Sequence, residues 1–213
     1  MVARPTLAPR DPLFWQDAAG LQGGYVDRCQ RRGYIVGMTD AVLPILITPH
    51  GALRTKARRV TPADAADVAR LVPRLFTTMY RAPGIGLAAP QVGVGLRLAV
   101  VDLQAEDPAL PGALTLINPE IIAASEEWVT REEGCLSVPG QYADVARPAQ
   151  VRIRYQDQDG RPQQIEAEGL LAACLQHEID HLDGVLFVDH ISALKRNMLL
   201  RRLAKEMKQK AAE

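Results

Sequence analysis

The segment His177–His181 has the residue types and the spacing of a metal site that supports hydrolysis. On a helix, side chains four positions apart share a face, so His177 and His181 can both reach one ion. Glu178 follows the first histidine, and its carboxylate would lie beside the ion, where it can take a proton from bound water. This is the H-E-x-x-H pattern of metal-assisted hydrolysis. It indicates a hydrolase, although such a string also occurs by chance on helices.

The neighbouring residues argue against two solvated surface histidines. Leu170, Cys174, His177 and His181 fall at helical spacing on one face, which predicts a buried stripe. Two buried imidazoles and a carboxylate would be costly unless they were paired. A bound metal ion would supply that pairing.

A catalytic metal site also needs a third protein ligand and an open fourth position. Cys135 is the preferred third ligand, because the glycine before it and the proline beyond it suit an irregular strand or loop that holds a side chain toward a ligand. Asp189 and His190 are the alternatives, as in an H-E-x-x-H peptidase that cleaves internal bonds. In such a peptidase, metal binding would survive the substitution Cys135→Ala. If Cys135 is a ligand, the same substitution should abolish metal binding.

The glycine-rich segment Gly84–Gln91 superficially matches the dinucleotide-binding pattern G-x-G-x-x-A. That pattern must follow a strand and open a helix. Here a helical pattern precedes it and Pro90 would interrupt a helix after it, so nucleotide binding is rejected. The glycines are expected to allow close approach of a peptide backbone, and Gln91 offers an amide donor.

The elements that must position these residues are read from hydrophobic periodicity. A helix is expected from Thr61-Pro62 to Tyr80, with a cap near Asp64, and Pro73 should kink or break it. A second helix, from about residue 169 to 182, carries the histidines, and residues 191–210 form a terminal amphipathic helix. Strands are expected at residues 41–48, 96–103, 113–117, 121–124, 151–155 and 163–167, of which the last two form a hairpin. Strands gathered before a late helix indicate an α+β fold.

The amino-acid composition limits the classes of protein to which the chain can belong. The 213 residues carry 25 basic and 25 acidic side chains, so no bulk attraction to DNA or a membrane is expected. No apolar run approaches transmembrane length. Three cysteines argue against a secreted disulfide scaffold and favour the cytoplasm. Residues 1–37 show no sustained period and are expected to be a loosely ordered extension, with Met38 as a candidate start, ahead of a catalytic domain at residues 38–213.

Three segments together carry a resemblance to a known family. They are similar, in the same order, to the three signature motifs of the peptide deformylase family, and their ranges are Gly84–Gln91, Glu133–Ser137 and His177–His181. The resemblance covers the chain from about residue 41 through the terminal helix. It implies an enzyme that removes the N-formyl group from the formyl-methionine terminus of newly synthesised proteins and releases formate.

The resemblance also implies the metal and its ligands. Cys135, His177 and His181 would hold ferrous iron in cells, with zinc, nickel or cobalt able to take its place. Ligand type alone would have predicted zinc. Glu178 would act as the acid–base group, with the Gln91 side chain and the Leu136 N–H as donors to the developing oxyanion. The residues implied for the methionine side chain and the peptide backbone are Ile85, Gly86, Leu170, Ala173 and Cys174.

Some features leave two interpretations open. Glu133 would pair with Arg147 to fix the cysteine segment, or the two would form an inconsequential surface pair. Asp180 would support a histidine ring or be a solvated helix residue. Tyr142 stands where many family members have arginine. A catalytically silent relative that binds peptides or ribosomes is a third possible function, but every expected ligand and Glu178 are present.

The C-terminal segment is strongly basic. From Lys195 to Lys210 there are seven basic residues and one acidic residue. By resemblance to members that bind the ribosome through their last helix, this segment could contact RNA phosphates. The alternative is a solvated helix face with Leu194, Leu203 and Met207 packed against the domain.

Overall fold

The structure is a computed structural model that describes residues 42–103, 106 and 112–210. The predictions for residues 1–37 and for Met38 lie outside the described residues. The helices and strands, in chain order, are α2 (Ala65–Arg81), β1 (Gly86–Ala88), β2 (Leu98–Val101), β3 (Leu114–Ala124), β4 (Trp128–Cys135), β5 (Val138–Pro148), β6 (Gln150–Gln156), β7 (Pro162–Glu168), α3 (Gly169–Leu182) and α4 (Ala193–Lys210).

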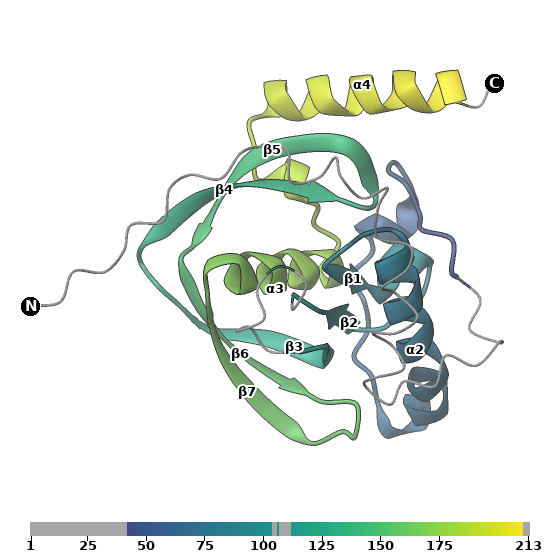
Figure 1. The fold of residues 1–213 in the computed structure, drawn as a ribbon, viewed down its shortest axis with the longest axis vertical. Helices are drawn as coiled ribbons and strands as arrows, with labels where there is room; N and C mark the ends of the chain where they lie inside the picture. Colours follow the sequence, from purple (N-terminus) through teal and green to yellow (C-terminus); the bar gives the residue numbers. More distant parts are fainter. Residues whose placement is uncertain (1–41, 104–105, 107–111, 211–213) are drawn as a thin grey trace, which may run out of the picture. The chain divides into compact units, whose positions relative to one another are not determined.

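The strands form two sheets around a central helix. The larger sheet has the order β1-β2-β3-β6-β7, with each neighbouring pair antiparallel, and β4 pairs with β5 in a separate two-stranded sheet. Helix α3 lies between these sheets, and α4 lies on the outer side of β5 (Figure 1). The predicted α+β fold is confirmed.

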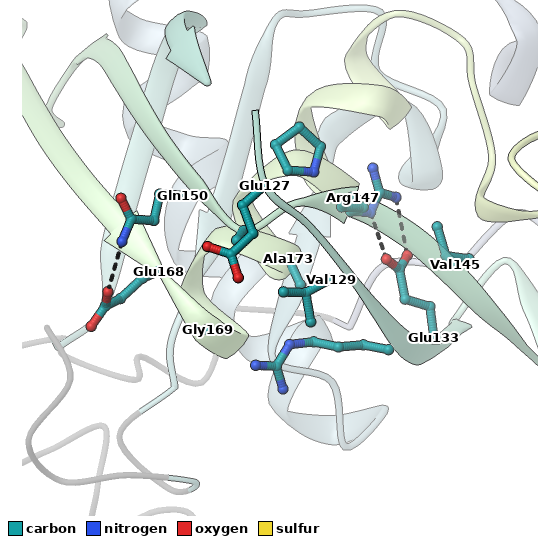
Figure 2. A pocket seen from close by; sticks show the side chains of 12 residues that line it. Glu127, Val129, Glu133, Val145, Arg147, Gln150, Glu168, Gly169 and Ala173 are labelled. Carbon is teal, nitrogen blue, oxygen red and sulfur yellow. Dashed lines mark hydrogen bonds and ion pairs between the residues drawn. The ribbon is translucent and has the colours of Figure 1, made fainter. Parts of the chain in front are cut away.

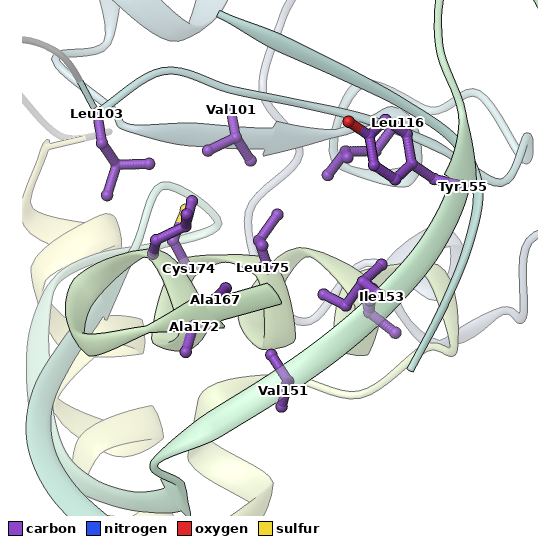
Figure 3. Packing of buried hydrophobic residues seen from close by; sticks show 12 residues of the cluster. Val101, Leu103, Leu116, Val151, Ile153, Tyr155, Ala167, Ala172, Cys174 and Leu175 are labelled. Carbon is purple, nitrogen blue, oxygen red and sulfur yellow. The ribbon is translucent and has the colours of Figure 1, made fainter. Parts of the chain in front are cut away.

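The core joins α3 to the larger sheet. Leu175 is fully buried and packs in one cluster with Val101 of β2 and Ile153 of β6 (Figure 3). Strand β7 passes directly into α3 at Gly169, whose φ of 62° is in the left-handed region that favours glycine. The helix that carries the histidines is therefore fixed both by its packing and by its direct connection to the sheet.

The predicted helix start at Thr61-Pro62 is a short 3-10 turn, Pro62–Asp64, in which Thr61 and Asp64 form a capping box. Helix α2 follows directly from this turn at Ala65. Pro73 was expected to kink or break this helix; the helix runs without a break from Ala65 to Arg81, so the expected break is wrong. A continuous buried stripe explains this, because packing outweighs the one hydrogen bond that proline removes; its residues are Val68, Leu71, Val72, Leu75 and Met79.

Other expectations for strands need correction. Residues 42–48 form no strand; instead the Leu46 N–H donates to the Gln91 carbonyl and the Thr48 N–H to the Ser137 carbonyl. The strands expected at 113–117 and 121–124 are one strand, β3, whose ladder with β6 continues past an irregularity beside Asn118. The expected strand at 96–103 is shortened to β2. The hairpin of β6 and β7 is confirmed.

The terminal helix begins at Ala193, two residues later than expected. Of the three apolar residues expected to pack against the domain, only Leu203 is buried, whereas Leu194 and Met207 are exposed. Glu206 adds a polar anchor, since it accepts a hydrogen bond from the buried Gln141 of β5. In the described part of the chain, no helix is long and apolar enough to cross a membrane.

Candidate metal centre

Helix α3 and the end of β4 bring the three candidate ligands together. One ligand atom each from Cys135, His177 and His181 lies within 4.8 Å of the others. The Cys135 Sγ is 3.1 Å from the His181 Nε2. A thiolate and two imidazoles are a donor set that suits zinc and other first-row transition metals. The residues present therefore fit a metal ion.

The orientation of His177 agrees with that fit. Its Nδ1 lies 2.9 Å from the Glu133 Oε2, which leaves Nε2 to face a ligand. The Nδ1 of His181 is buried, and no described residue pairs with it. Asp189 and His190, the alternative third ligands, lie outside the cluster: Asp189 pairs with Arg54 and accepts from the Leu186 N–H, and His190 contacts Asp180.

A buried ion pair supports the first histidine. Arg147 donates from Nε and Nη2 to the two oxygens of Glu133, at 2.5 and 3.0 Å, and both side chains are less than a tenth exposed. Burial opposes ionisation of Glu133, but hydrogen bonds from His177 and Arg147 lower its pKa to about 2. Arg147 also donates to Asp180 at 2.8 Å. The alternatives of a surface pair and of a merely solvated Asp180 are therefore wrong.

Glu178 lies in a dry environment beside this cluster. Its side chain is buried, and its Oε2 has no hydrogen-bond partner among the described residues. Gly86 of β1 abuts it so closely that an added Cβ would overlap the Glu178 Oε1. Burial raises the pKa of Glu178 to about 7, with the charge on His177 acting in the opposite direction. A carboxylate with a pKa near neutrality can both accept and return a proton.

Gln91 and Leu136 lie beside the cysteine. The buried Gln91 side chain is oriented by its own backbone neighbourhood, because its Oε1 accepts from the Ala88 N–H at 2.8 Å. Its Nε2 is consequently directed toward the Ser137 Oγ at 3.2 Å and the Cys135 Sγ at 3.7 Å. The Leu136 N–H has no acceptor among the described residues. The Gln91 amide therefore lies beside the candidate ligand Cys135, which Leu136 follows directly in the chain.

The structure separates the residues expected around the methionine side chain. Leu170 is 39% exposed, so the prediction of one buried stripe was wrong at that end. Cys174 is buried in the core, with its Sγ 3.9 Å from the Ile85 carbonyl oxygen. Ala173 faces the other way and lines a cavity of about 280 Å³ between α3 and the β4–β5 hairpin (Figure 2). The helix geometry explains why Ala173 and Cys174 face different surroundings, since the side chains of adjacent helical residues point about 100° apart around the helix axis.

Two contacts of the site were missed in the sequence. Ser137 accepts a hydrogen bond from the Gln91 amide, and the Ser137 N–H points at the Cys135 Sγ at 3.4 Å. His190 lies 2.7 Å from Asp180, which links it to Arg147. Ser137 ends the motif Glu133–Ser137, two residues after the candidate ligand, and that place in the motif was the signal for it. His190 carried no signal, because its contact depends on how the chain returns after α3.

Comparisons with known proteins agree with this geometry. A sequence profile of the polypeptide deformylase family matches residues 42–197. Peptide deformylases from Mesorhizobium japonicum and Rhizobium meliloti are 51% and 50% identical to this chain, over 80% and 81% of it and 96% and 98% of their own lengths. The profile match covers the whole segment that holds the candidate site.

Solved structures give the same result. The peptide deformylase of Legionella pneumophila has a TM-score of 0.74 and 45% identity, covering 81% of this chain and 99% of its own. That of Synechococcus elongatus, in complex with actinonin, has a TM-score of 0.70 and 46% identity, covering 75% and 86%. Fold and site define a metal-dependent hydrolase with an α+β domain. The chain belongs to the peptide deformylase family, whose members remove the N-formyl group from nascent peptides.

Proposed function

We propose that Cys135, His177 and His181 hold one ferrous ion and that Glu178 is the acid–base residue of formyl-methionine hydrolysis in this chain. The observation that carries the proposal is the convergence of the three ligand atoms within 4.8 Å, next to a buried carboxylate. Zinc, nickel or cobalt could take the place of iron. The bound ion would polarise the formyl oxygen and acidify a water molecule.

The side chains around the ion have separate tasks. Glu178 accepts a proton from the attacking water and passes it to the leaving amine nitrogen, and its dry surroundings keep its proton affinity close to that needed at neutral pH. The Gln91 amide and the Leu136 N–H donate to the formyl oxygen as negative charge develops on it. Loss of one such donor usually costs about 3 kcal/mol of barrier.

The substrate is proposed to enter beside β1 and α3. Gly86 presents backbone to the peptide, which pairs with it as an added strand would. Its lack of a side chain also leaves room for Glu178. The methionine side chain would contact Ile85 and Cys174, with the exposed Leu170 at the rim, whereas Ala173 lines the separate cavity beside the β4–β5 hairpin.

Formate release tests the assignment. Nickel-loaded, anaerobically prepared protein should release formate from a formyl-Met tripeptide, and Glu178→Gln should lower turnover by about 10²- to 10⁴-fold while metal content stays unchanged. Cys174→Ala is the matched control for Cys135→Ala: only the latter should lose the metal. No turnover by metal-loaded wild type would refute the proposed roles.

We further propose that α4 binds the ribosome. Lys195, Arg201 and Lys205 are exposed on this helix, and exposed basic side chains can contact RNA phosphates. In cosedimentation with ribosomes at low salt, Arg201→Glu with Lys205→Glu should weaken binding about tenfold. Reversal of two exposed charges elsewhere, Lys56→Glu with Arg70→Glu, is the control. Equal binding by both double variants would refute docking through α4.

We also propose a cellular location for the protein and bounds for its catalytic domain. Few cysteines and a substrate made by translation favour the cytoplasm. The family match that begins at residue 42 supports a catalytic domain at residues 38–213, preceded by an extension at residues 1–37.

A further inference from the structure

Gly134, directly before the candidate ligand Cys135, faces an aromatic ring on the neighbouring strand. Gly134 and Tyr142 are register partners in the β4–β5 ladder. A Cβ added to Gly134 would lie 2.6 Å from the Tyr142 Cε1 and 2.7 Å from its Cδ1. The φ of Gly134 is not in the left-handed region. Glycine is therefore required here by the space that the ring occupies and not by backbone conformation.

The contact lies where the strand needs support. The β4–β5 ladder is regular up to Gly134 and shifts register between Gly134 and Cys135, which pairs with Val138. Such an irregularity re-aims the side chain that follows it. A glycine within a strand also weakens the strand, and a cross-strand aromatic ring that covers it restores packing.

Both neighbours of Gly134 serve the metal centre. On one side, Glu133 contacts the Nδ1 of His177 at 2.9 Å. On the other side, the Cys135 Sγ lies 3.1 Å from the His181 Nε2. A shift of the backbone at Gly134 would consequently move a candidate ligand and the carboxylate that orients another.

We propose that Tyr142 is a positioning residue for the metal centre: its ring covers Gly134 and holds residues 133–135 in the arrangement that directs the Cys135 thiolate at the ion. The ring's contact with the glycine carries this role. The inference rests on the metal site proposed above and goes beyond it, because Tyr142 belongs neither to the candidate ligands nor to the acid–base machinery.

Cobalt binding tests the role independently of turnover. Titration of the metal-free protein with Co²⁺ gives an affinity and a thiolate-to-cobalt absorption band that reports on the Cys135 sulfur. Tyr142→Ala should weaken Co²⁺ binding about tenfold and shift or reduce this band. Tyr142→Phe should stay within about twofold of wild type. Trp128→Ala, which removes an exposed aromatic from the same hairpin, is the matched control and should change neither quantity.

A double variant separates this contact from general loss of structure. Gly134→Ala alone should weaken Co²⁺ binding, because its methyl group collides with the ring, whereas adding Tyr142→Ala should recover much of the loss. The inference would be overturned if the losses of Co²⁺ affinity in the two single variants added up in the double variant. It would also be overturned if Tyr142→Ala kept the wild-type Co²⁺ affinity and the wild-type thiolate-to-cobalt band. Absence of Co²⁺ binding by the wild type would instead refute the proposed metal site. Thermal unfolding of each metal-free variant verifies that it is folded.

Discussion

At the scale of single residues, the site depends on buried charges that are paired. Glu133 has a pKa of about 2 and is ionised at neutral pH, where it accepts hydrogen bonds from Arg147 and contacts His177. Arg147 in turn reaches Asp180. Because ions are costly to bury alone, each member of this group constrains the position of the others. The contact with Glu133 thereby fixes the orientation of the His177 ring.

Glu133→Gln tests this constraint. Among the described residues, the change leaves the buried Arg147 with Asp180 as its one anionic partner, so we expect the free energy of unfolding to fall by about 3 kcal/mol. His177 also loses its charged acceptor, so metal affinity should fall about 10- to 100-fold. Urea unfolding and metal titration measure these effects.

The neighbouring Glu132 provides the control, because its side chain is exposed on the same strand. Glu132→Gln should change stability by no more than about 0.5 kcal/mol and leave metal affinity unchanged. Equal effects of the two substitutions would show that the buried pair does not support the site.

At the scale of elements, α2 shows packing prevailing over local preference. Pro73 lacks the N–H that would bond to the carbonyl of Ala69, yet the helix continues to Arg81. Its buried stripe supplies the compensating energy, since each fully buried aliphatic side chain contributes about 1.5–3 kcal/mol. The proline is tolerated and not required by this geometry.

Pro73→Ala should therefore stabilise the protein. Restoring the hydrogen bond and removing the ring clash should raise the free energy of unfolding by about 1–3 kcal/mol, measured by urea denaturation. Ala69→Gly, at an exposed position of the same helix, should lower it by about 1 kcal/mol and confirms that the assay detects helix stability. A destabilised Pro73→Ala would show that the ring itself packs usefully.

At the scale of the whole molecule, one core connects the metal helix to the larger sheet. Leu175 lies on α3, two residues before the first histidine, His177. Its side chain is fully buried against β2 and β6. Any loosening of this core would move the histidines relative to Cys135, which belongs to the other sheet. Stability and ligand geometry are thus coupled.

Leu175→Ala should reveal that coupling. Truncation of a fully buried leucine typically costs about 2–5 kcal/mol, so the thermal unfolding midpoint should fall by several degrees. Leu194→Ala on α4 is the control: the residue is 73% exposed and its loss should cost no more than about 0.5 kcal/mol. Calorimetry measures the thermal unfolding midpoint of both variants. Similar midpoints for the two variants would contradict the burial of Leu175.

Much of the fold was predictable because it depends on neighbours close in sequence. The capped start at Thr61, the β6–β7 hairpin and the bounds of α3 follow from turn residues and periodicity within a few positions. Expectations failed where long-range packing decides, as in the unbroken α2 and the fused β3. Leu46 and Thr48 likewise donate their N–H groups to the carbonyl oxygens of Gln91 and Ser137, which lie far along the chain.

The site divides in the same way. The sequence by itself determined that His177, Glu178 and His181 lie together, because helical spacing alone brings His181 onto one face with the residues three and four positions before it. The motifs also predicted Cys135 as the third ligand. Only the tertiary structure decided that its Sγ lies 3.1 Å from the His181 Nε2, that Glu133 and Arg147 are buried behind His177, and that Tyr142 covers Gly134. These contacts depend on the register of β4 with β5 and on how α3 packs between the sheets, and no local pattern encodes either.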